Sequence, residues 1–199
     1  MANLTKMEAG SRVNLSKENP ELTKIKVGLS WDEKQGVVVD LDASCVVAIA
    51  GKAVGAEDSN GVKDGIVWYN GTTYKDAVKH DGDNRTGEGD GDDEVIHIDL
   101  AKLADTEEAL IVATVYSKSD VIKFGRAANA YLKVYNDETG EELYSFDLTE
   151  DGSSATAIEM ARFYKKDGEW RLGTLGDPVL MPDGTAPANG LEAIVGKYQ

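Results

Sequence analysis

The chain has 199 residues but only one cysteine, two histidines and four prolines. A single cysteine excludes an internal disulfide and fits a reducing compartment. Cys45 begins the longest purely apolar run, Cys45–Ala50, where a buried and inert thiol is expected. Those six residues fall far short of the roughly 20 that cross a bilayer. The N-terminal residues also lack the apolar segment of a signal peptide, so we expect a cytoplasmic protein without a transmembrane segment.

Positive charge is scarce as well. The chain has 21 lysines and arginines against 36 acidic residues, which gives a net charge of -15. An acidic surface of this size repels phosphate backbones and anionic lipid, so nucleic-acid binding and direct membrane docking are excluded. Any membrane association is therefore expected only through partner proteins.

Short apolar segments between glycine-containing turns are the main pattern of the chain. From Ile25 to Trp31, apolar and other residues alternate with the period of two that is typical of a half-buried strand. Further strand signals occur at Val37–Ile49, Ile66–Tyr69, Val95–Leu100, Leu110–Tyr116, Ala130–Tyr135, Leu143–Leu148, Ala157–Tyr164 and Trp170–Leu175. These segments predict an all-β fold, an antiparallel β-sandwich or barrel of roughly nine or ten strands.

Helix signals are few. Ser119–Ala128 and Leu191–Lys197 are the two candidates for short helices, and Met181–Gly190 predicts an irregular connection. We therefore expect one β domain over residues 1–180, with residues 181–199 forming an irregular connection and a short C-terminal element of the same domain.

One segment differs sharply from the rest. The fourteen residues Asp81–Glu94 hold seven acids and one base, Arg85, and so carry a charge of -6. A solvated acidic loop is the simplest interpretation. However, clustered like charges repel one another, whereas calcium gathers about 6–8 oxygen ligands and glycines let main-chain carbonyls turn toward an ion. The four glycines of this segment therefore favour a metal site.

The residue types indicate which metal. Zinc prefers histidine and cysteine, which the chain nearly lacks, and magnesium uses only one or two carboxylates. Calcium fits best, and seven acids with Asn84 are enough for two ions. The loop is not an EF-hand, because Arg85 and Thr86 fall where that motif needs a ligand and a glycine.

A second acidic pair supports a cation site. Asp40 and Asp42 are two residues apart on a predicted strand, so both carboxylates face the same way while Leu41 faces the core. Two neighbouring charges there need compensation. A cation shared with the Asp81–Glu94 loop would supply it, and so would Lys34 or a position in water at the strand end.

The run Gly82–Glu94 (GDNRTGEGDGDDE) resembles the signature of the TerD family of bacterial tellurite-resistance and stress proteins. Further similar segments, in order, are Leu15–Lys17, Val27–Asp32, Asp40–Ser44, Trp68–Asn70, Val95–Leu100, Phe124–Tyr131 and Glu169–Trp170. The resemblance spans Leu4 to Gly176. It implies a calcium-binding β-sandwich that acts in the cytoplasm during chemical stress, together with protein partners of the same resistance system.

The resemblance also implies a set of ligands. Carried over residue by residue, the calcium ligands fall at Asp40, Asp42, Asp83, Asn84, Thr86, Gly87, Glu88, Asp90, Asp92, Asp93 and Glu94.

Catalysis is not expected. No nucleophile elbow or phosphate-binding Gly-Lys-Ser/Thr is present, and His80 and His97 near acids are expected to be surface hydrogen-bonding residues. The alternative to a non-catalytic binder is a calcium-dependent hydrolase of phosphoester or nucleotide substrates. Direct chemistry on tellurite would require a reactive Cys45.

Overall fold

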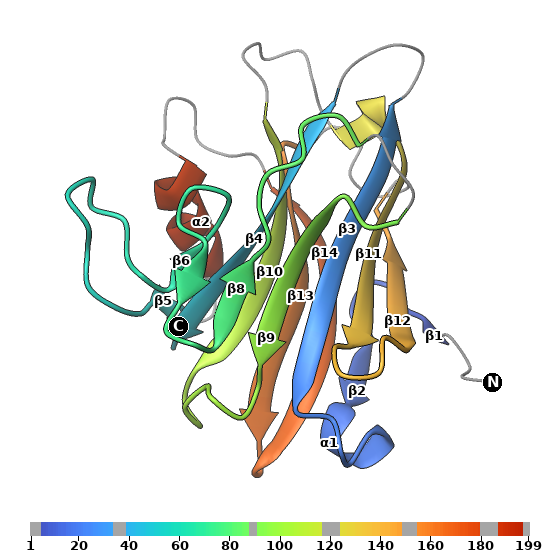
Figure 1. Cartoon of the computed structure of the whole chain (residues 1–199), viewed down its shortest axis with the longest axis vertical. Coiled ribbons are helices and arrows are strands. Elements are labelled where there is room, and N and C mark those ends of the chain that lie inside the picture. Colours follow the sequence, from blue (N-terminus) through green and yellow to red (C-terminus); the bar gives the residue numbers. More distant parts are fainter. Residues whose placement is uncertain are drawn as a thin grey trace.

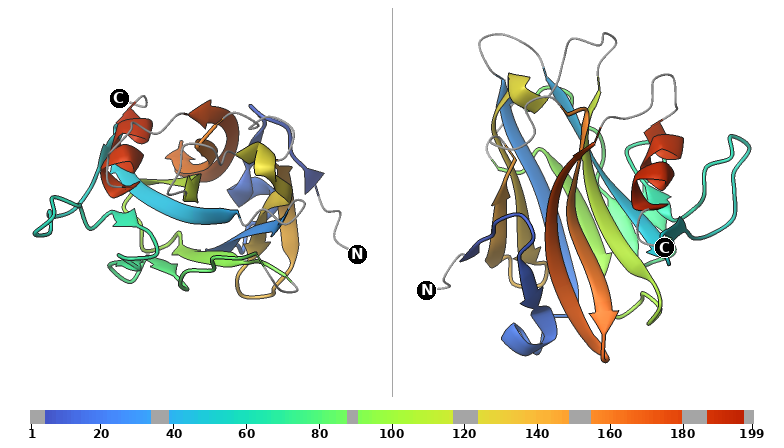
Figure 2. Two further views of the ribbon diagram at one scale, coloured as in Figure 1. Left: turned by 90° about the horizontal axis from the view of Figure 1, so that it is seen from above. Right: turned by 180° about the vertical axis from the view of Figure 1, so that it is seen from behind.

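A computed structural model describes residues 5–33, 39–87, 91–116, 124–148, 155–179 and 187–196. These residues form two facing β-sheets that do not close into a barrel (Figures 1 and 2). The prediction of an all-β sandwich is therefore confirmed. No helix in this part of the chain has the length and apolar character needed to span a membrane.

The first sheet has seven strands, and one of them, β1, runs parallel to its neighbour β12. In spatial order its strands are β1 (Thr5–Lys6), β12 (Glu142–Asp147), β11 (Ala127–Asn136), β3 (Lys24–Glu33), β9 (Glu94–Asp99), β8 (Val78–His80) and β7 (Thr73–Tyr74).

The second sheet also has seven strands, all paired antiparallel. In spatial order, six of them are β2 (Arg12–Asn14), β14 (Glu169–Val179), β13 (Ala157–Lys166), β10 (Glu108–Tyr116), β4 (Asp40–Ile49) and β5 (Lys52–Ala53). The seventh, β6 (Ile66–Val67), pairs with β4 along the same edge as β5.

Every segment with a strand signal contains a strand in the structure. Strands β1, β2, β5, β7 and β8 were not predicted, because two or three residues are too few to show a period of two. The one-turn helix α1 (Leu15–Glu18), whose first turn is capped by the Asn14 side chain, was not predicted either.

Two helix predictions need correction. Within Ser119–Ala128, residues 119–123 lie outside the described residues. Of the remainder, Phe124–Arg126 form a 3₁₀ turn and Ala127 already begins β11. The C-terminal helix α2 covers Pro187–Val195, so it begins before Leu191. Proline is well tolerated in the first turn of a helix, which explains the earlier start.

The core has two parts. The larger lies between the sheets and includes Leu41 of β4 and Ile96 of β9. The smaller lies on the outer face of the second sheet, where α2 places Leu191 and Val195 over Val46 of β4. Strand β4 is consequently buried on both faces over most of its length, and its accessible residues lie at its two ends, Asp40 and Ile49.

Candidate metal centre

The site begins at the first residues of β4. Leu41 is fully buried against the inter-sheet core, as expected, and Asp40 and Asp42 point to the opposite face. Across the ladder, Asp40 lies opposite Tyr116 and Asp42 opposite Thr114 on β10. The two carboxylates are thus fixed by the register of two long central strands.

Asp83 joins them from the loop that follows β8. This loop rises to the end of the sandwich where β4 begins (Figure 1). One carboxylate oxygen from each of Asp40, Asp42 and Asp83 lies within 4.8 Å of the others, and we call these residues the carboxylate cluster. They line a cavity of about 200 Å³ whose remaining described walls are Tyr69, Arg85 and Tyr116.

Among the described residues, the positive charge beside the carboxylate cluster is that of Arg85, which pairs with Asp83 at 3.0 Å and offsets only part of the cluster's negative charge. Lys34, the base that the sequence offered for this role, lies outside the described residues. Burial, with the charges of Asp83 and Glu94, raises the pKa of Asp40 to about 6. Burial, with the charges of Glu94, Asp40 and Asp83, raises the pKa of Asp42 to about 8. One buried oxygen of Asp40, Oδ1, has no hydrogen-bond partner among the described residues. Three crowded carboxylates with an unused buried oxygen fit the hard oxygen ligands that calcium takes.

Asp92, also a predicted ligand, uses its carboxylate elsewhere. The Tyr135 hydroxyl donates to Oδ1 at 2.8 Å, and Lys26 Nζ donates to Oδ2 at 3.1 Å. The carboxylate rests directly on Gly28 of β3, where an added Cβ would lie 2.2 Å from Asp92 Cγ. Asp92 therefore anchors the loop to the first sheet.

Asp93 and Asn84 form a second anchor. The Trp31 backbone N–H donates to Asp93 Oδ2 at 3.0 Å, and Asn84 Nδ2 donates to Asp93 Oδ1 at 3.1 Å. Asn84 Oδ1 in turn accepts the backbone N–H of Thr86 at 3.2 Å. These side-chain oxygens hold the loop in shape around Asp83.

Glu94 is buried and fastens the loop to β4. Its Oε2 accepts the Ala43 backbone N–H at 2.6 Å, and its Oε1 accepts that of Asn84 at 3.3 Å. His80 also links the loop to β4. Its Nδ1 accepts the Gly82 backbone N–H at 3.0 Å. Its Nε2 therefore carries the proton and donates to the Ala43 carbonyl at 3.1 Å.

The buried position of His80 corrects the expectation of a surface histidine, since only 2% of it is exposed. The strand pattern contained the signal. His80 is two residues from buried Val78 on β8 and therefore shares its inward face. Glu94 likewise shares the face of Ile96 and Ile98 on β9.

Gly87 lies against Trp31 with a positive φ of 59°, and an added Cβ would be 2.5 Å from Trp31 Nε1. Of the remaining predicted ligands, Glu88 and Asp90 lie outside the described residues. The eleven predicted residues therefore fall into three that converge on a cavity, six that shape or fasten the loop, and two without a described position.

His97 ties the start of the loop to the β11–β12 turn. Its Nε2 lies 2.9 Å from Asp81 Oδ2, and its Nδ1 lies 2.8 Å from Asp137 Oδ2. Both nitrogens face carboxylate acceptors, so the doubly protonated ring fits this position. Burial lowers the pKa of His97, but the hydrogen bonds with Asp137 and Asp81 outweigh it and the net direction is upward.

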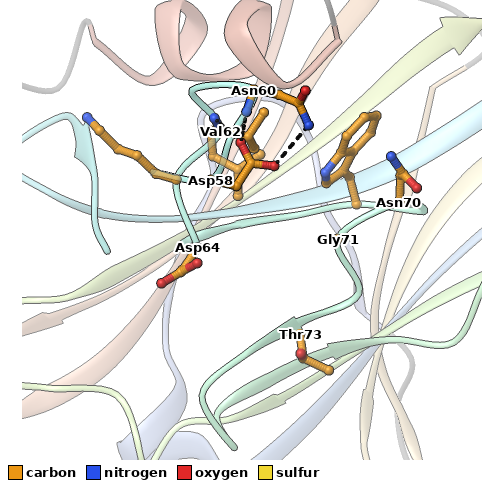
Figure 3. A pocket seen from close by; sticks show the side chains of 10 residues that line it. Asp58, Asn60, Val62, Asp64, Asn70, Gly71 and Thr73 are labelled. Carbon is orange, nitrogen blue, oxygen red and sulfur yellow. Dashed lines mark hydrogen bonds between the residues drawn. The ribbon is translucent and has the colours of Figure 1, made fainter. Parts of the chain in front are cut away.

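A larger cavity of about 390 Å³ lies beside α2 (Figure 3). Its Asp58 carboxylate already accepts the backbone N–H groups of Asn60 and Val62, at 2.7 and 2.9 Å. Lys63 on its wall is paired with Glu192 of α2 at 2.5 Å. The charged groups here stabilise a loop and a helix contact.

Cys45 is fully buried, and burial raises the pKa of its thiol well above the usual range. A protonated thiol in the core is unreactive, which argues against direct chemistry at this residue.

Comparison with known proteins adds family and fold. A family model described as the TerD domain matches residues 3–198, which extends the likeness beyond Gly176. The tellurium resistance protein TerD of Serratia marcescens is 35% identical over 96% of this chain and 95% of its own length. General stress protein 16U of Bacillus subtilis is 36% identical over 84% of this chain and 86% of its own length.

A solved structure shares the fold. The crystal structure of a TerD homologue from Streptomyces coelicolor superimposes with a TM-score of 0.66 at 18% identity, covering 84% of this chain and 94% of that one.

Proposed function

The chain belongs to the TerD family, and on that premise we propose that it is a non-catalytic, calcium-binding stress-response protein of the tellurium-resistance type. In this proposal a bound calcium ion orders the loop around Asp83, and the ordered loop presents a surface to protein partners. The observation that carries the proposal is the convergence of Asp40, Asp42 and Asp83 on one cavity.

The position of the carboxylate cluster supports a cation rather than a chance acidic patch. Only 6% of Asp42 is exposed, and its raised pKa means that the surrounding protein compensates its ionised form only in part. Leaving a carboxylate in that state costs stability, because each unit of pKa shift corresponds to about 1.4 kcal/mol. A divalent cation between the three side chains removes that cost.

The loop anchors support the same interpretation. Asp92, Asp93 and Glu94 fasten the returning end of the loop to Tyr135, Trp31 and Ala43. This leaves Asp83, at the other end, in reach of β4. With one converging oxygen from each, the three carboxylates supply fewer oxygens than calcium takes, so their second oxygens, main-chain carbonyls, water or further loop residues would complete the shell.

Thermal unfolding with excess calcium, magnesium or chelator tests the proposal. We expect calcium to raise Tm, with about 2.7 kcal/mol of stabilisation at a hundredfold excess over Kd, and magnesium to do less. Asp42→Asn should abolish the shift. Asp64→Asn, which removes the same charge from an exposed loop position, should leave it unchanged. A wild-type Tm that does not respond to calcium refutes the proposal.

Ordering of the loop has its own measurement. Amide hydrogen exchange across Asp81–Gly87 should slow on calcium addition in the wild type and not in Asp42→Asn. If exchange in this segment is the same with calcium and with chelator, calcium does not order the loop and that part of the proposal fails.

A further inference from the structure

Arg85 occupies an unexpected place for a residue at a cation site. It is the one cationic side chain among the described residues that line the cavity with the carboxylate cluster. Its Nε donates to Asp83 Oδ2 at 3.0 Å, while 78% of its side chain is exposed. A fixed positive charge at this point opposes the binding of a divalent ion, so its presence needs an explanation.

The electrostatics indicate what Arg85 does without a metal. Its charge lowers the pKa of both Asp40 and Asp42, against the larger upward effects of burial and neighbouring acids. The guanidinium therefore compensates part of the repulsion within the carboxylate cluster. Its hydrogen bond with Asp83 holds the guanidinium at this position. Because the side chain is long and exposed, it can also leave Asp83 for solvent.

We propose that Arg85 is a tethered cation that a divalent ion must displace from Asp83, so that metal binding is an exchange and Arg85 sets the affinity. The inference rests on the proposed cation site and specifies how that site is tuned. When Asp83 turns to an ion, the guanidinium loses its partner and is repelled toward solvent.

If calcium displaces Arg85, removing the Arg85 charge should strengthen calcium binding but lower the stability of the metal-free protein. Arg85→Gln removes the competing charge, so calcium should bind more tightly, by a factor of about three to ten for a charge at the protein surface. The same substitution removes the compensating charge in the metal-free state, so Tm in chelator should fall. Arg85→Lys keeps the charge and should stay close to the wild type in both measurements.

Lys79 offers a matched control. It forms an exposed ion pair with Asp81 at 2.5 Å, with the same two-residue separation as the Asp83–Arg85 pair, and it lies on β8, just before the same loop. Lys79→Gln removes the same charge without touching the cavity. We expect it to change the calcium Kd by less than about twofold, because exposed charges at a distance are screened by salt.

Calorimetric calcium titration of the four proteins, with Tm measured in chelator, decides the matter. Tighter binding and a lower metal-free Tm in Arg85→Gln, but not in Arg85→Lys or Lys79→Gln, is the expected result. If the wild type binds calcium and Arg85→Gln binds with the same Kd, or if Lys79→Gln has an equal effect, the exchange is refuted while the site stands. If the wild type binds no calcium, the proposed function fails and the inference fails with it.

Discussion

Replacing Gly28 by alanine tests the contact between strand β3 and the Asp92 carboxylate. Gly28 lies in the middle of β3, opposite Val95 on β9 and Lys133 on β11. An added Cβ there would be 2.2 Å from Asp92 Cγ and 2.4 Å from both carboxylate oxygens. A flexible side chain can escape such a contact only by moving, and Asp92 is held from both sides by Lys26 and Tyr135.

The cost follows from the contacts that must break. Hydrogen bonds to a charged group contribute about 1.5–3 kcal/mol each, and Asp92 accepts two of them. Its side chain is only 7% exposed, so water replaces these bonds poorly. We expect Gly28→Ala to lower the free energy of unfolding by about 3–5 kcal/mol. For a chain of this length that corresponds to a fall in Tm of roughly 6–20 °C.

A double-mutant cycle isolates the cause. In an Asp92→Ala background the obstructing carboxylate is gone, so Gly28→Ala should cost less than about 1 kcal/mol there. Gly173→Ala on β14 is the matched control, because an added Cβ there meets only Tyr164 Cε1, at 3.8 Å. That change should be close to neutral. The assay is urea unfolding of all variants in chelator. An equal cost of Gly28→Ala in both backgrounds would refute the placement of Asp92.

Three further predictions concern the Asp81–Glu94 loop and the residues that contact it. Gly87→Ala should destabilise by about 2 kcal/mol or more in urea unfolding, through its positive φ and the contact with Trp31, and a neutral result would contradict that contact. Because the pKa of His97 is raised, its stabilisation is complete below about pH 6.5 and is lost as pH rises through the folded pKa. His97→Gln should therefore cost about 1 kcal/mol at pH 6 and less at pH 9, and the same cost at both pH values would refute the charged bridge. Asp92→Asn should keep a calcium-dependent rise in Tm that Asp42→Asn loses, and loss of the rise in Asp92→Asn would make Asp92 a ligand.

Much of the fold could be predicted from local pattern. A period of two from Ile25 to Trp31 was enough to identify β3, and the same pattern with flanking turns identified the other long strands. The two-residue strands β5 and β7 could not be found this way, because they exist only through pairing with β4 and β8. The start of β11 at Ala127 is likewise set by its pairing with Glu33 of β3.

The candidate site, too, could be predicted only in part from the sequence. The sequence shows directly that seven acids lie within Asp81–Glu94. The two-residue spacing of Asp40 and Asp42 on a strand places both side chains on one face. Local sequence therefore determined that the chain is a β protein with carboxylates gathered near one end. It could not assign those carboxylates, because in the sequence Asp83 and Asp92 are similar acids in one glycine-rich loop.

Only the tertiary structure made that distinction. Asp92 accepts a hydrogen bond from Tyr135, which is 43 residues away along the chain, and pairs with the charge of Lys26. Asp83 instead lies beside Asp40 and Asp42 and adds to their repulsion. The role of a carboxylate depends on which donors and charges lie within a few ångströms of it. Those neighbours come from strands brought together by sheet pairing, so the sequence determined which acids are present and the fold decided which of them gather at one cavity.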